Sequence, residues 1–110
     1  MVLSDKNISS MTKEIFNQAY NPKVFGAKNL IDPLINNPEK KSKLDFIILF
    51  SSVSAIAGNI GQSNYVSANT FLDSYAHYLS NKGIPTSSIN LGVVNDVGAV
   101  ANDTKLKKKN

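Results

Sequence analysis

Two stretches in the first third of the chain carry apolar residues at helical spacing. The first stripe consists of Ile15, Phe16 and Ala19. It predicts a helix over residues 12–20, which ends at Asn21 because a following proline disfavours helical backbone. Pro22 suits the first position of a second helix, over residues 22–36, in which Pro33 is a candidate for a kink. The second apolar stripe consists of Val24, Ala27, Leu30, Ile31, Leu34 and Ile35.

The middle of the chain changes from polar to apolar. Residues 36–43 contain Pro38 and three lysines and predict a loop. Residues 44–50 are then almost continuously apolar, without alternation of polar and apolar positions. A parallel strand that is covered on both faces has this composition, so we expect a central strand here. The next segment, residues 51–64, is rich in Ser and Gly and predicts another loop.

A helix and a second strand follow this loop. The apolar side of the predicted helix, residues 65–79, consists of Phe71, Leu72, Tyr75, Ala76 and Leu79. Gly83 and Pro85 end that helix, and residues 86–94 predict a short strand. Strand, helix and strand within about fifty residues form a parallel βαβ unit. We therefore expect an α/β protein, in which a parallel βαβ unit is preceded by two helices.

Four polar residues stand near the expected ligand site. Ligands of open α/β sheets bind beyond the carboxyl ends of the strands, which places residues 51–64 and 92–98 at the site. The four residues are Lys23, Ser52, Tyr65 and Asn69. Tyr65 and Asn69 are four positions apart and share a helix face, while Ser52 follows the strand and Lys23 lies near the start of the second helix. Each of them alone also suits a capping or surface role.

Composition narrows the classes of function. The chain has 110 residues, enough for one domain or a piece of one, and its 42% of hydrophobic residues are typical of a globular protein. It has no cysteine and one histidine, His77, so we expect neither a disulfide nor a metal site. Its longest apolar run, residues 46–50, is too short for a membrane span, and no signal peptide precedes it. We expect a cytoplasmic protein without a membrane partner.

Positive charge is concentrated at one end. Four of the 12 lysines lie within residues 105–110, and the chain has no arginine. We interpret residues 104–110 as a basic, disordered tail that follows a domain formed by residues 1–103. A nucleic-acid binder that uses this tail is an alternative. The absence of arginine, which makes bidentate contacts to bases and phosphates, argues against it, so no nucleic-acid partner is expected.

The four polar residues recur in a known pattern. The segment from Phe50 to Asn69 reads FSSVSAIAGNIGQSNYVSAN. It resembles the active-site signature of the ketoreductase domains of polyketide synthases, members of the short-chain dehydrogenase superfamily. In that family a serine precedes the tyrosine by thirteen positions and an asparagine follows it by four, as Ser52, Tyr65 and Asn69 do. The segment PKVFGAKNL, around Lys23, is similar to the lysine motif of the family.

Two further segments extend the resemblance over nearly the whole chain. Residues 83–85 and 90–92 resemble the Gly-x-Pro turn of the family and the strand end beside the nicotinamide. The chain departs from the family in two places. The loop between Lys23 and Ser52 is about five residues longer than expected, a change that a surface loop tolerates. Leu91 stands where many relatives carry tryptophan.

The resemblance implies a Rossmann-like fold and an NADPH-dependent reaction. A β-ketoacyl thioester on an acyl carrier would be reduced to a β-hydroxyacyl thioester in polyketide or fatty-acid type synthesis. Tyr65 would donate the proton, and Lys23 would stabilise its deprotonated form while binding a cofactor ribose hydroxyl. Ser52 would donate to the substrate carbonyl, and Asn69 would hold the lysine or a relay water. Lys23, Tyr65 and Gly92 would contact the cofactor.

The resemblance also bears on the stereochemistry of the product. Ketoreductases that form D-hydroxy products carry Leu-x-Asp ahead of the lysine motif, and Leu3-Ser4-Asp5 is similar to it. Asp5 is therefore a candidate for substrate stereocontrol. The opposite type usually shows tryptophan eight residues before the tyrosine, where this chain has Ala57. The D-hydroxy product is favoured.

One feature of a complete reductase is absent from this sequence. No G-x-G-x-x-G motif, which binds the dinucleotide pyrophosphate in Rossmann folds, occurs in the chain. By the family pattern the chain corresponds to the C-terminal portion of a ketoreductase domain. We expect such a portion to be inactive alone and to expose an apolar strand edge. The alternative is a catalytically silent remnant or interaction module, and in either case the rest of a polyketide synthase is the expected partner.

Overall fold

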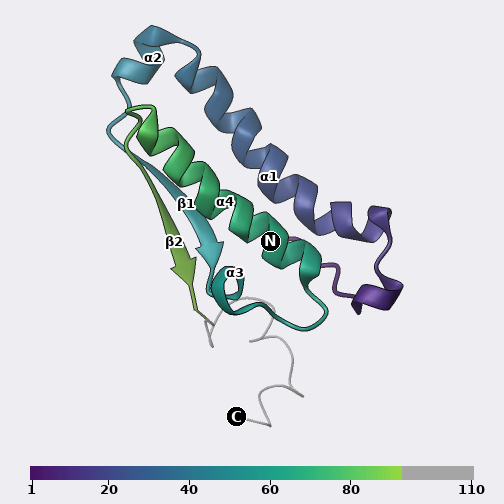
Figure 1. The fold of residues 1–110 in the computed structure, drawn as a ribbon. Helices are drawn as coiled ribbons and strands as arrows, with labels where there is room; N and C mark the ends of the chain where they lie inside the picture. Colours follow the sequence, from purple (N-terminus) through teal and green to yellow (C-terminus); the bar gives the residue numbers. More distant parts are fainter. Residues whose placement is uncertain (93–110) are drawn as a thin grey trace.

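A two-stranded sheet and two long helices make up most of the structure. A computed structural model of the protein describes residues 1–92. Figure 1 shows the helix α4 lying between the sheet and the helix α1. The long elements are α1 (Lys13–Ile35), β1 (Ile47–Ser52), α4 (Ser63–Asn81) and β2 (Thr86–Leu91). The short helices are η1 (Ile8–Ser10), α2 (Pro38–Ser42) and α3 (Ser54–Ala57).

The sheet confirms the predicted βαβ unit. The strands β1 and β2 are parallel, in a register that runs from Ile47 opposite Thr86 to Ser52 opposite Leu91. The helices α3 and α4 form the connection between them. Both strands therefore end at the same edge of the sheet, and Ser52 occupies the last position of β1 there.

The predicted helix break at Asn21 is wrong. The helix α1 is continuous through Pro22 and Pro33, and its first turn is capped by the Thr12 hydroxyl, which accepts a hydrogen bond from the backbone of Ile15. Pro22 is exposed, while Ala19 and Val24, on either side of it in the sequence, are buried. Ala19 from the first predicted stripe and Val24 and Ile31 from the second are buried on one continuous helix, whereas Leu30 of the second stripe is exposed. The packing of α1 against α4 outweighs the backbone hydrogen bond that proline lacks.

Two predicted loops contain short helices. In residues 36–43, the side chain of Asn37 accepts hydrogen bonds from the backbone N–H groups of Glu39 and Lys40, both at 3.1 Å, and caps α2 with proline at its first position. In residues 51–64, β1 continues to Ser52, and α3 and the start of α4 follow. The helices α2 and α3 are too short or too polar to show an apolar stripe, which is why their residues were predicted as loops.

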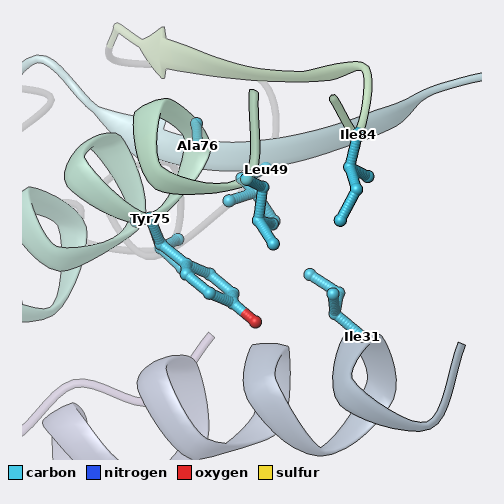
Figure 2. Packing of buried hydrophobic residues seen from close by; sticks show 7 residues of the cluster. Ile31, Leu49, Tyr75, Ala76 and Ile84 are labelled. Atoms are coloured by element: carbon cyan, nitrogen blue, oxygen red, sulfur yellow. The ribbon is translucent and has the colours of Figure 1, made fainter. Parts of the chain in front are cut away.

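The core lies between the sheet, α4 and the second half of α1. Its buried members are Ile31, Leu49, Leu72, Tyr75, Ala76, Leu79 and Ile84. Figure 2 shows Tyr75 of α4 reaching toward α1 beside Leu49 and Ile31. Its hydroxyl donates to Oδ1 of Asp32 at 3.1 Å. Burial, together with the carboxylate of Asp32, raises the pKa of Tyr75 to about 12.

The expectation that β1 is covered on both faces is not met within residues 1–92. Buried and exposed positions alternate along β1, because α4 covers one face of the sheet. On the other face Phe50 is 61% exposed, and Phe46, which precedes the strand, is 67% exposed. From β2, Ile89 and Leu91 are exposed as well. We call the exposed residues Phe46, Ile48, Phe50, Ile89 and Leu91 the open sheet face.

Candidate active site

The end of β1 presents a hydroxyl group with one free hydrogen. Ser52 Oγ accepts hydrogen bonds from the backbone N–H and the hydroxyl of Ser54, at 3.2 and 2.9 Å. Ser54 is the first residue of α3, so the strand end and the following turn are held together by these two contacts. Both bonds use Ser52 as an acceptor. Its own hydrogen therefore remains available for a carbonyl oxygen.

The first turns of α4 carry Tyr65 and Asn69 on one face, as the spacing predicts. Asn69 is fully buried, and its Nδ2 donates to the backbone carbonyl of Tyr65 at 2.9 Å. Its Oδ1 is buried and has no hydrogen-bond partner among the described residues. Buried amide oxygens are almost always hydrogen-bonded in native proteins. The free Oδ1 of Asn69 thus marks a place for a donor such as an ammonium or a water.

Lys23 comes to Tyr65 from the neighbouring helix. It lies in the middle of α1, not near a helix start, because α1 is continuous. Its Nζ lies 5.0 Å from the centroid of the Tyr65 ring, which is within the range of a cation–π contact. The lysine is half-buried, and this burial lowers its pKa. Within residues 1–92 no carboxylate forms an ion pair with it.

A hydrogen bond from the strand joins the two halves of the site. Ser51 is buried at the end of β1, and its hydroxyl donates to the backbone carbonyl of Asn69 at 3.1 Å. This bond fixes the strand residue next to Ser52 against the helix turn that carries Tyr65. The structure therefore joins Lys23, Tyr65 and Asn69 by direct contacts and ties Ser52 to them through its neighbour.

The N-terminal segment is attached to the loop before α4. Asp5 accepts hydrogen bonds from Gln62 Nε2 on both carboxylate oxygens, at 3.3 and 3.1 Å. The backbone N–H of Lys6 donates to the carbonyl of Gly61 at 2.9 Å. The predicted stereocontrol residue therefore contacts Gln62, which precedes Tyr65 by three positions in the sequence.

Asn64 and Gln62 are site residues that the sequence pattern did not reveal. Asn64 is fully buried, and its Nδ2 donates to the carbonyls of Ser4 and Ile15, at 2.9 and 3.2 Å. It links the N-terminal segment, α1 and α4 immediately before Tyr65. An asparagine at a helix start reads as a local cap, so only its burial distinguishes this role.

A groove runs between the N-terminal segment and the loop before α4. It has a volume of about 640 Å³ and lies between residues 6–9 and residues 58–63, and Val66 also lines it. Two of its lining residues, Gly58 and Gly61, adopt positive φ angles of 74° and 77° that favour glycine. The groove is open to solvent, and Ser63 and Val66 of α4 are among its lining residues.

The last described residue of the site is Gly92. It is exposed and follows β2 directly, where the backbone N–H of Val53 donates to the carbonyl of Leu91 at 3.0 Å. Among residues 1–92, nothing lies within 4 Å of the place where a Cβ would stand. The predicted strand end at Val94, the rest of loop 92–98 and the tail 104–110 lie outside the described residues. Across residues 1–92, no helix has both the length and the apolarity to cross a bilayer.

The arrangement can carry out proton transfer to an oxygen atom. It combines a phenol with a neighbouring ammonium, a hydroxyl with a free hydrogen and a buried amide oxygen without a partner. Ser52 lies where the parallel strands end, which is the edge that binds ligands in α/β folds, and Ser51 ties this edge to the helix turn of Tyr65 and Asn69. Positioned donors of this kind stabilise charge that develops on a carbonyl oxygen.

Comparison with known proteins relates this geometry to one family. The family described as KR domain matches residues 1–96. The highly reducing polyketide synthase otaA of Aspergillus niger is 45% identical over 108 residues, and pspA of Penicillium soppii is 39% identical over 106. The matches cover 97% and 96% of this chain but 4% of each synthase.

Solved structures agree with these sequence matches. The A-type ketoreductases of a modular polyketide synthase superpose with a TM-score of 0.83 at 26% identity, over 99% of this chain and 22% of that one. A ketoreductase domain from the bacillaene assembly line superposes with a TM-score of 0.76 at 32% identity, over 98% and 26%. The chain therefore spans about a quarter of the solved domains that it matches.

Proposed function

Because the chain belongs to the KR domain family, the ketoreductase domains of polyketide synthases, we propose that it supplies the proton-delivering part of a β-ketoacyl reductase. The substrate is a β-ketoacyl thioester on an acyl carrier, and the product is the β-hydroxyacyl thioester. The observation that carries the proposal is the contact between Lys23 and Tyr65, 5.0 Å from ammonium to ring. Asn69 and Ser52 complete the set from the same helix and the adjoining strand end.

Tyr65 is the proton donor in this proposal. As a hydride reaches the carbonyl carbon, the oxygen becomes an alkoxide and takes the phenolic proton. The resulting tyrosinate lies beside the ammonium of Lys23, which stabilises it across a half-buried contact. The free Oδ1 of Asn69 accepts from a water or from that ammonium, and so provides a route by which the phenol regains its proton.

Ser52 is the second donor to the substrate oxygen. Because its Oγ already accepts two hydrogen bonds from Ser54, its hydrogen has a restricted set of directions. A donor oriented in advance stabilises developing negative charge without reorganisation during the reaction. Removal of one such donor typically lowers turnover by about 100- to 1,000-fold.

The cofactor of the proposed reaction is NADPH, which supplies the hydride when it is bound. The groups that the described residues leave free suit a ribose: the Lys23 ammonium has no carboxylate partner there, and the Asn69 oxygen has no donor. We propose that Lys23 and Tyr65 hold the ribose and that Gly92, without a side chain, admits the nicotinamide beside β2. The glycine-rich pyrophosphate turn then belongs to other parts of a ketoreductase domain, since the chain spans 22% of a solved one.

The substrate approaches along the groove between residues 6–9 and residues 58–63 in this proposal. Asp5 directly precedes Lys6, which lines this groove, and its two hydrogen bonds with Gln62 connect it to the loop that precedes Tyr65. Such a contact restricts the side from which the acyl chain enters. It is the physical basis on which we propose that Asp5 controls the stereochemistry, with the D-hydroxy product expected.

A chimeric enzyme tests the proposed function. Residues 1–96 replace the matching segment of the Aspergillus niger relative, and NADPH oxidation is followed with an acetoacetyl thioester. We expect turnover, and a loss of about 100- to 10,000-fold in kcat for Tyr65→Phe, which keeps the ring and removes the proton. Tyr20→Phe, a half-buried tyrosine of α1, is the matched control and leaves kcat unchanged.

The same assay separates the enzyme from a silent interaction module. For the 110-residue chain alone we expect neither NADPH binding nor turnover. A folded chimera that binds NADPH but is indifferent to Tyr65→Phe contradicts the assigned proton donor. A chimera that folds and binds NADPH without any turnover favours a remnant that only completes a larger synthase.

A further inference from the structure

A polar network lies beneath α4, one turn beyond the proposed site. Its centre is Asn90 of β2, whose Nδ2 lies 3.0 Å from Oδ2 of Asp73, 3.2 Å from the carbonyl of Ser52 and 3.3 Å from the hydroxyl of Ser51. The second carboxylate oxygen of Asp73 accepts from the hydroxyl of Ser88. The network therefore connects a carboxylate of α4 with the ends of both strands.

The position of this network is unusual for a strand under a helix. Along β2, Ser88 and Asn90 share the face that α4 covers, whereas Ile89 and Leu91 are exposed on the other face. A strand normally turns its apolar residues toward the helix that covers it. Departures from this pattern concentrate at functional sites, where a polar group has a task that packing alone does not require.

The bonds run on from the network to the proposed site. Ser51, which stands opposite Asn90 in the strand register, donates its hydroxyl to the backbone carbonyl of Asn69. The carbonyl of Ser52 is itself held by Asn90. Asp73 lies four residues after Asn69, one turn along α4. The network thus contacts Ser52 at the end of β1 and, through Ser51, the turn of α4 that ends at Asn69. The distance between these two elements sets the distance between Ser52 and Tyr65.

We propose that Asp73 and Asn90 form a positioning pair that sets the end of β1 against the first turns of α4. The proposal deepens the proposed function, on which its catalytic meaning rests. Ser52 comes from the strand and Tyr65 from the helix, so their relative position depends on what lies between these elements. Apolar packing leaves some freedom to slide, whereas a carboxylate bonded through a rigid amide to a backbone carbonyl defines one arrangement.

The carboxylate of Asp73 is suited to this role. Partial burial on its own would raise its pKa, but hydrogen bonds from Ser88 and Asn90 and the nearby His77 lower it below its usual value. The group therefore stays ionised at neutral pH. Charge-assisted hydrogen bonds are shorter and stronger than neutral ones, which makes the link to Asn90 a stiff one.

The test is a set of variants of the 110-residue chain, read by NMR without any cofactor. The readouts are the side-chain amide signals of Asn69 and the cross-peak between Lys23 and the Tyr65 ring. We expect Asn90→Leu to shift the Asn69 signals and to abolish the cross-peak. Ser80→Ala is the matched control, because it removes a bond of 2.8 Å between α4 and Thr86 at the other end of β2, and both readouts keep their native values.

A double variant distinguishes positioning from simple stabilisation. Asp73→Leu combined with Asn90→Leu removes both partners of the central bond, so the melting temperature recovers in part, although the Ser88 hydroxyl and the Ser52 carbonyl lose the bonds that the pair gave them. We expect the Asn69 signals to stay shifted nevertheless. Native signals in either variant overturn the proposal. Should Asn90→Leu not fold, Ser51→Ala removes the single bond to the Asn69 carbonyl, and unchanged Asn69 signals overturn it equally.

Because this readout needs no turnover, it is independent of the chimera assay. An inactive chimera with shifted Asn69 signals in Asn90→Leu rejects the proposed function and keeps the positioning pair. An active chimera with unchanged signals does the reverse.

Discussion

At the scale of single residues, the site holds the ammonium group of Lys23 in a partly buried position, where it is less hydrated than in the unfolded chain. Burial lowers the pKa of Lys23 from the ordinary value of 10.5, so the ammonium is less favourable in the folded chain than in the unfolded one. Below the lowered pKa the charge therefore destabilises the fold, and this effect vanishes as the pH rises toward 10.5. The contact with the Tyr65 ring returns about 0.5–1 kcal/mol.

Lys23→Met tests this trade between stability and chemistry. We expect the free energy of unfolding at pH 7 to rise, and the difference from the natural chain to shrink as the pH rises from the lowered pKa toward 10.5, because the folded chain then releases the proton of the lysine. In the chimera the same variant loses turnover. Urea titrations at several pH values measure the first effect, with Lys28→Met on the same helix as control. A less stable Lys23→Met protein at pH 7 contradicts the prediction.

At the scale of elements, periodicity was sufficient for the long helices and the strands but not for their ends. The stripe from Val24 to Ile35 and the run of residues 44–50 identified α1 and β1, and a parallel βαβ unit followed from their order. Pro22 did not end α1, because packing against α4 decides helix length there and local propensity does not. Polar junctions such as Asn64 could not be foreseen, since which carbonyls it meets depends on contacts distant in the sequence.

The proline inside α1 has a measurable effect on stability. We expect Pro22→Ala to raise the free energy of unfolding by about 1–3 kcal/mol, because an interior proline costs a helix about 3 kcal/mol and its stiffening of the unfolded chain offsets about 0.4–1 kcal/mol of that. Chemical denaturation followed by circular dichroism measures the change. Pro38→Ala, at the first position of α2, is the control, for which no gain is expected. An unchanged or lower value for Pro22→Ala contradicts the prediction.

At the scale of the whole molecule, the layers are incomplete within residues 1–92. One side of the sheet is covered by α4, whereas the open sheet face exposes Phe46 and Phe50 by more than half. Apolar residues gathered on one surface favour association in water. The continuous apolar run of residues 44–50 therefore provides two apolar strand faces. Within residues 1–92, α4 covers one of them and the other is exposed to solvent.

A charge on the open sheet face reduces association. We expect the isolated chain to self-associate at high concentration and Phe50→Lys to lower its average mass in sedimentation, with the free energy of unfolding changed by less than about 0.5 kcal/mol. Leu30→Lys is the control, since Leu30 is 75% exposed on α1, away from the sheet. Equal masses for the natural chain and Phe50→Lys would count against the open sheet face as the contact.

The hydrogen bond between Tyr75 and Asp32 allows the core to be followed by ultraviolet absorbance. The chain has four tyrosines and no tryptophan, so tyrosinate absorbance is read without interference. Tyr75 ionises only near pH 12 in the folded chain, so the stability that its protonated hydroxyl contributes is lost as the pH rises from its ordinary pKa of 10.0 to about 12. An optical titration in alkali thus records the opening of the core as a late rise in absorbance, without any added dye or label.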